Sequence, residues 1–163
     1  MKLRIFVILL INLGWLPVTL PGRAQNENPN GGQPQSLPMV SLHVGKAQLI
    51  TEVASTHEQQ ETGLMYRTKM ADNHGMIFLL PTITTATFWM KNTLIPLSVA
   101  YIDKNGVILE IHDMKALDTS ITRSDSDQVA YALETNLHWF ALNGIKPGDR
   151  IEPPPSTLGQ PGN

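Results

Sequence analysis

The stretch Leu97-Ser-Val-Ala-Tyr-Ile-Asp-Lys-Asn-Gly-Val-Ile-Leu-Glu-Ile111 places two apolar, β-branched runs on either side of Lys104-Asn105-Gly106. Asn-Gly readily adopts the positive φ angles that a tight hairpin turn requires. The pattern therefore predicts a β-hairpin with strands over 97–103 and 107–111.

Further short strands are predicted on both sides of this hairpin. They are expected, from their β-friendly composition and the turn signals between them, over 40–45, 47–54, 76–80, 84–91, 129–134 and 150–152. Pro81 is expected to end the strand over 76–80. Two short helices are predicted, one after overlapping capping boxes at Ser55 and Thr56, the other over 137–142. This order favours a mainly β fold, a compact antiparallel barrel or sandwich.

The N-terminus has the layout of a secretory signal peptide. Lys2 and Arg4 precede an apolar run over 5–16, and a small-x-small site follows at Gly22-Arg23-Ala24. The run is shorter than the roughly 20 residues that a membrane span needs. We expect cleavage after Ala24, no stable membrane anchor afterwards, and a periplasmic or secreted protein; an uncleaved N-terminal anchor is the alternative.

Two segments next to the folded unit have the composition of disordered chain. Residues 25–38 and 153–163 are rich in Asn, Gln, Gly, Ser and Pro and nearly free of apolar side chains. We interpret them as a linker and a tail, which leaves residues 39–152 as a single β-rich domain.

Composition excludes several classes of function. The chain has no cysteine, which rules out a disulfide framework, thiol catalysis and Cys-ligated zinc. Loss of Lys2, Arg4 and Arg23 with residues 1–24 changes the formal charge from −2 to −5, which argues against a nucleic-acid partner. No phosphate-binding or dinucleotide glycine motif is present, so no cofactor is expected.

Five blocks carry a resemblance to a known family. They are 63–67 (GLMYR), 75–78 (GMIF), 88–97 (FWMKNTLIPL), 131–134 (YALE) and 144–150 (GIKPGDR). Together they resemble the bacterial and archaeal family called domain of unknown function 192, from about residue 44 to 151. The resemblance implies a compact β-rich domain, often behind a signal peptide, with no established activity. The family usually has Asp where this chain has Ser98, and often a basic residue where it has Thr62.

The 88–97 block suggests a binding site. Strand alternation would place Trp89 and Lys91 on one face, next to the amide of Asn92 and the hydroxyl of Thr93. An aromatic face with a few polar groups suits a sugar or a peptide fragment. The structural alternative is that Trp89 belongs to the core, Lys91 extends to water and Asn92-Thr93 shape a turn.

Arg67 and Glu134 are the candidate charged groups. Arg67 could hold an anion through its planar guanidinium, and Glu134 could be its partner or a general acid. A purely structural Arg-Glu pair between strands is the commoner outcome. Our leading hypothesis is a non-catalytic ligand-binding or accessory module of the cell envelope, whose partner is a small molecule, glycan, peptide or envelope protein. Its cleft is predicted to contain Met65, Arg67, Trp89, Lys91, Asn92, Thr93 and Glu134.

Two other functions stay open from the sequence. One is an envelope glycan or peptide hydrolase that uses Glu134 as its acid. The other is copper binding, since exported copper proteins use methionine and histidine ligands. The spacing of Met65, Met70, Met76, Met90 and Met114 gives it little support, because no Met-x-Met or His-x-His cluster occurs. We therefore predict no catalytic residue and no metal ligand.

Overall fold

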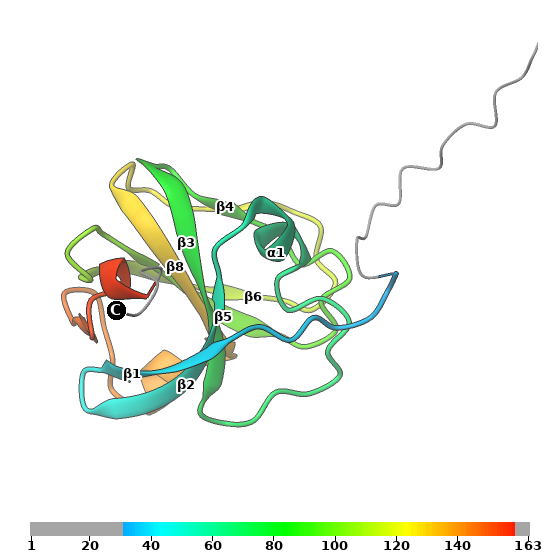
Figure 1. The fold of residues 1–163 in the computed structure, drawn as a ribbon, viewed down its shortest axis with the longest axis horizontal. Helices are drawn as coiled ribbons and strands as arrows, with labels where there is room; N and C mark the ends of the chain where they lie inside the picture. The colour runs from blue at the N-terminus through cyan, green and yellow to red at the C-terminus, as the bar shows by residue number, and fades with distance from the viewer. Residues whose placement is uncertain (1–30, 159–163) are drawn as a thin grey trace, which may run out of the picture.

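The computed structural model describes residues 31–158 and confirms a mainly β fold. Seven strands form one sheet in the order β6-β5-β8-β3-β2-β1-β9, and β4 and β7 form a small second sheet. Figure 1 shows the large sheet curled into a half-barrel, with α1 and β4 near one end of β3. The strands are β1 (Met39–Val44), β2 (Ala47–Ala54), β3 (His74–Thr84), β4 (Thr87–Phe88), β5 (Leu97–Ile102), β6 (Ile108–Met114), β7 (Thr122–Arg123), β8 (Val129–Asn136) and β9 (Ile151–Glu152). The helical segments are α1 (His57–Thr62), α2 (Trp139–Leu142) and the 3-10 turn η1 (Pro155–Thr157).

The predicted hairpin is present as β5 and β6, which pair antiparallel from Leu97↔Met114 to Ile102↔Ile108. Its turn is wider than the Asn-Gly signal suggested, because Gly106 alone takes a positive φ, of 80°. The Asp103 carboxylate accepts hydrogen bonds from the backbone N–H groups of Asn105 and Val107. These bonds hold a loop from Asp103 to Val107 in which one left-handed residue is sufficient.

The large sheet contains one parallel pair, so the expectation of a wholly antiparallel sheet is corrected. β2 and β3 run parallel, from Ile50↔His74 to Ala54↔Phe78, while every other neighbouring pair in the large sheet is antiparallel. A parallel pair needs a crossover long enough to return the chain to the end where the first strand began. Residues 55–73, which include α1, supply that crossover.

Pro81 does not end β3, contrary to the sequence prediction. The strand continues to Thr84, but its pairing with β8 is interrupted between Leu79 and Thr84, and its pairing with β2 ends at Phe78. Pro81 is exposed there. Its missing N–H therefore costs no hydrogen bond of the sheet, which is the setting in which strands tolerate proline.

The strand predicted over 84–91 is much shorter in the structure. β4 covers only Thr87–Phe88, pairs with β7, and is followed by a turn at Lys91 and Asn92. Asn92 adopts a positive φ of 59°, which a strand residue cannot do and which Asn tolerates better than most residues. Trp89 and Lys91 therefore lie outside any strand, and strand alternation does not determine where their side chains point.

Both faces of the sheet are covered by apolar side chains, which explains why all six residues of β5 are buried. Alternate residues of a strand point to opposite faces, so Ala100 and Ile102 enter one core while Val99 and Tyr101 enter the other. The first core also holds Trp139 from α2. The second core lies on the side of α1 and β4, and the site described below is built into it.

Parts of the predicted linker and tail lie against the domain. Leu37 packs on the second core, Pro155 is buried, and Leu158 packs on the first core. The predicted signal peptide, residues 25–30 of the linker and residues 159–163 of the tail lie outside the described residues. Within residues 31–158, no helix is long and apolar enough to cross a membrane.

Candidate functional site

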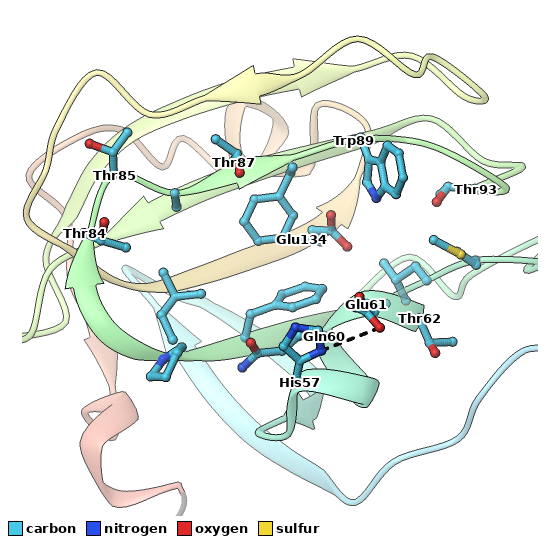
Figure 2. Close-up of a pocket in the computed structure, with 18 of the residues that line it drawn as sticks. His57, Gln60, Glu61, Thr62, Thr84, Thr85, Thr87, Trp89, Thr93 and Glu134 are labelled. Atoms are coloured by element: carbon cyan, nitrogen blue, oxygen red, sulfur yellow. Dashed lines mark ion pairs between the residues drawn. The ribbon is translucent and has the colours of Figure 1, made fainter. Parts of the chain in front are cut away.

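A pocket of about 470 Å³ opens between α1, the far end of β3 and the β4 segment. Figure 2 shows it with Glu134 in the middle, Trp89 and Thr87 on one side and α1 on the other. Its walls are mostly apolar or threonine side chains. The lining residues that matter below are Glu134, Phe78, Phe88, Trp89, Thr62, His57 and Glu61.

Glu134 is the buried acid of this pocket. The residue is 4% exposed, and no hydrogen bond or ion pair joins its side chain to another residue between 31 and 158. Buried carboxylates in proteins are normally paired, because an unpaired buried charge costs several kcal/mol. The rest of the described chain therefore leaves this carboxyl without a partner, at the surface of the pocket.

Strand pairing fixes where the Glu134 carboxyl points. Glu134 lies in β8, opposite Met76 of β3 and Val99 of β5, and all three residues face the second core. The neighbouring Gly75 permits this close pairing, since a Cβ on Gly75 would collide with the backbone oxygen of Glu134. A glycine in the middle of a strand often marks such a close approach of two backbones.

Burial changes the protonation of Glu134. Removal of the carboxyl from water raises the pKa of Glu134 to about 8, because the low-polarity surroundings disfavour its charged form. Burial also raises the pKa of the nearby Tyr101, with smaller contributions from the charges of Glu134 and Glu110. Tyr101 donates its hydroxyl to the Thr122 carbonyl at 3.0 Å, so its proton already has an acceptor.

Aromatic side chains form one wall of the pocket and its mouth. Phe78 and Phe88 meet edge to face with ring centroids 5.0 Å apart. Trp89 lines the pocket and is 48% exposed, which is unusual for so large an apolar side chain. The Lys91 ammonium lies 5.3 Å from the centre of the Trp89 ring. The two side chains are therefore neighbours, although they do not belong to a strand.

The rim opposite Trp89 is formed by α1. Thr56 and Gln59 make the predicted capping box, in which each side chain accepts from the other residue's backbone N–H. On the exposed surface of this helix, His57 and Glu61 form an ion pair at 3.6 Å (Figure 2). The helix ends at Gly63, and the following Leu64 and Met65 continue the lining of the pocket.

The structure brings together four of the seven predicted site residues. Met65, Trp89, Thr93 and Glu134 line the pocket, whereas Arg67, Lys91 and Asn92 do not. Asn92 has a structural part, because its amide donates to the Tyr66 hydroxyl at 2.8 Å and its carbonyl accepts from the Tyr66 N–H. This double link ties the segment after α1 to the turn after β4.

Arg67 pairs with a partner that the sequence did not suggest. Its guanidinium lies 2.6 Å from the Glu52 carboxylate of β2 and also donates to the Gln35 carbonyl. The other Glu52 oxygen accepts from the Leu37 N–H. Arg67 thus forms a structural ion pair between segments of the chain, but with Glu52. Glu134 does not have Arg67 as its partner.

Several lining residues were missed by the sequence analysis, chiefly Phe78, Phe88 and the threonines between 82 and 87. Phe78 and Phe88 belong to the family-like blocks 75–78 and 88–97. Their place in these blocks did not indicate that they line a pocket. Thr82, Thr84, Thr85 and Thr87 form an unusual threonine-rich run, a composition that could have been noticed. Their convergence depends on β3 continuing past Pro81.

The methionines and histidines do not gather at one place. Met76, Met90 and Met114 are buried in the second core, as gap-filling methionines commonly are, while Met65 lines the pocket. His112 pairs with Glu110 at 2.7 Å. Among residues 31–158, no group of three or more His, Asp or Glu side chains is placed to hold a metal ion.

Comparison with known proteins gives the family of this chain. Residues 40–153 match the model of the family DUF192, described as "Uncharacterized ACR". The chain belongs to this family. No curated protein matches the chain.

Two solved structures share the DUF192 chain's fold at 34% sequence identity each. One is a Sinorhizobium meliloti protein described as a "putative transcription regulator", with a TM-score of 0.69 over 74% of this chain and 97% of that one. The other is a Novosphingobium aromaticivorans protein of unknown function, with a TM-score of 0.66 over 71% of this chain and 86% of that one.

The two departures from the usual DUF192 pattern lie in different places. Ser98 is buried on the face of β5 opposite the pocket, where its hydroxyl donates to Asp113 and accepts from the His138 N–H. His138 in turn lies 3.0 Å from Asp113. Thr62, by contrast, lines the pocket, and its buried hydroxyl has no partner within residues 31–158.

Proposed function

We propose that this DUF192 chain is an exported, non-catalytic ligand-binding module whose site is the Glu134 pocket. The observation that carries the proposal is the Glu134 carboxyl, which is 4% exposed, faces a pocket and has no partner within the described chain. Keeping such a group costs stability, so a ligand that satisfies it is the simplest reason for its presence. The ligand classes to test are small molecules, glycans and peptides of the cell envelope.

The accompanying features fit binding better than structural support. Trp89 keeps about half of its surface exposed at the mouth, where stacking on a ligand would bury it. The pocket volume of about 470 Å³ lies within the range of sites for small molecules. The regulator description of the S. meliloti protein is not extended to this chain, because a formal charge of −5 after signal cleavage disfavours nucleic-acid binding.

A thermal-shift screen of the purified protein against envelope glycans, muropeptides and short peptides tests the proposal. A ligand at about 100 times its Kd adds about 2.7 kcal/mol of stability, a shift of several degrees. Trp89→Ala should lose the shift. Leu94→Ala is the matched control, since Leu94 is similarly exposed in the same segment but does not line the pocket. Equal shifts in both variants would reject the Glu134 pocket as the site.

One observation favours hydrolysis as a second candidate function. A carboxyl with a pKa of about 8 is protonated at neutral pH and could act as a general acid on a glycan or peptide. Turnover of such a substrate that disappears in Glu134→Gln, with binding retained, would establish this alternative. Binding without turnover in the wild-type protein would support the non-catalytic module.

A further inference from the structure

We infer that the group entering the Glu134 pocket is an alkylammonium, a primary amine carried on an apolar stem, held by the Glu134 carboxylate and the surrounding aromatic rings. The inference rests on the proposed binding function and specifies the ligand's chemistry. A free amine and a lysine side chain of a peptide share this chemistry, and the experiment below distinguishes them.

The charge of the pocket points to a cation. Among residues 31–158, no lysine or arginine lines it, and its titratable lining residues are Glu134, Glu61 and His57. The last two are paired with each other on the exposed rim, so neither supplies a counter-charge to Glu134 when it ionises. A buried carboxylate is stable when an opposite charge also supplies hydrogen bonds to it, and an ammonium does both.

The walls fit the stem and the charge of the same ligand. Phe78, Phe88 and Trp89 offer aromatic surfaces, which attract cations through the negative faces of their rings. Lys91 already lies near the Trp89 ring in this manner at the mouth. Leu64 and Leu80 add apolar surface for several carbon atoms of a stem.

Proton linkage gives the inference a signature of its own. With a pKa of about 8, Glu134 is mostly protonated in the empty pocket at pH 7, so an ammonium must displace that proton to form the ion pair. Affinity for an amine should therefore rise about tenfold from pH 7 to pH 9 and then level off. A neutral ligand that accepts a hydrogen bond from the protonated acid would bind more weakly over the same interval.

The other charged groups around the pocket are distinguishable from Glu134. His57 and Glu61 lie on the exposed rim of α1, where they pair with each other at 3.6 Å, and not in the buried part of the pocket. Tyr101 on β5 titrates well above this interval, because burial raises its pKa. Lys91 holds its ammonium 5.3 Å from the centre of the Trp89 ring and does not line the pocket. A change in affinity over this interval therefore reports on Glu134.

The test titrates the protein, followed by amide NMR shifts, with n-hexylamine, n-hexanol and hexanoate, which share a stem and differ in charge. We expect n-hexylamine to bind with a Kd on the order of millimolar, as befits a ligand of seven heavy atoms. It should bind at least tenfold more tightly than the other two, with the pH dependence given above. Glu134→Gln should weaken its binding tenfold or more, whereas Glu58→Gln, at an exposed acid of α1 that does not line the pocket, should leave it within twofold.

The outcomes separate the two proposals. If n-hexanol or hexanoate binds in the pocket more tightly than n-hexylamine, the ammonium inference is overturned while the binding function stands. If none of the three binds and the envelope screen gives no shift, both are overturned. If n-hexylamine binds as expected, Nα-acetyl-lysine amide identifies the source: comparable affinity indicates a peptide side chain, and much weaker affinity indicates a free amine.

Discussion

Two buried glutamates of this protein differ in their partners: Glu52 is paired with Arg67, whereas Glu134 faces a pocket. Glu52 is 9% exposed and its two oxygens are used, one by the Arg67 guanidinium at 2.6 Å and the other by the Leu37 N–H. Glu134 is 4% exposed and has no partner among the described residues. The first acid holds the segment after α1 against β2. The second is available to something outside the described chain.

The difference shows that burial alone does not define the role of a charged residue. Removing either partner of a buried ion pair destabilises the protein, because the remaining charge is then buried alone. An unpaired acid is itself a source of instability at neutral pH. The same substitution, glutamate to glutamine, should therefore have opposite effects at the two positions.

The largest effect is expected for Glu52→Gln. The amide keeps the shape of the side chain but leaves the Arg67 guanidinium, only 15% exposed, without its counter-charge. We expect a loss of about 3 kcal/mol or more in the free energy of unfolding at pH 7, measured by urea denaturation. The exposed Glu58→Gln serves as the control and should change stability by at most about 0.5 kcal/mol. Similar losses of stability in both variants would show that the Glu52–Arg67 ion pair does not account for the effect.

At Glu134 the same substitution should stabilise the protein at neutral pH. The pKa of Glu134 rises from an ordinary 4.5 to about 8 on folding, so the folded state holds a proton that the unfolded state loses in between. Its contribution to stability is complete below about pH 4.5 and is lost as the pH rises through 8. Between pH 5 and pH 7 the wild-type protein should lose about 2–3 kcal/mol relative to Glu134→Gln. A difference that stays constant over this range would show that Glu134 is already paired.

A smaller effect is expected at the link between the two regions. Asn92→Ala removes the hydrogen bond to Tyr66 and places an alanine at a φ of 59°, at a cost of about 1–2 kcal/mol. Asn92→Gly also loses the hydrogen bond, but glycine adopts a positive φ without strain. It should therefore lower the stability less than Asn92→Ala does. Thermal unfolding of the two variants would measure this order, and the reverse order would mean that backbone conformation does not contribute.

The smallest effect is expected for the exposed acid of the pocket rim. Glu61→Gln breaks an ion pair whose side chains are 85% and 65% exposed, so water and salt already screen it. We expect a change of at most about 0.5 kcal/mol in urea unfolding. A loss as large as that of Glu52→Gln would show that the rim of α1 contributes to the fold in a way that exposure does not reveal.

Local patterns predicted most of the strands and little of the site. The hairpin of β5 and β6, the capping box of Thr56 and the strand β8 follow from residues that are neighbours in sequence. Pro81 misled the prediction because its cost depends on whether another strand pairs at that point. The 84–91 strand failed because the turn at Asn92 depends on Tyr66, 26 residues earlier.

The sequence by itself determined a cysteine-free, mainly β chain of the DUF192 family and the residue types available for a site. Tertiary structure alone decided which glutamate would pair with Arg67. That choice depends on the parallel pairing of β2 with β3 and on the crossover through α1, which bring Glu52 to Arg67 and leave Glu134 facing the pocket. Side chains this far apart in sequence meet only through strand register, and no local pattern encodes it.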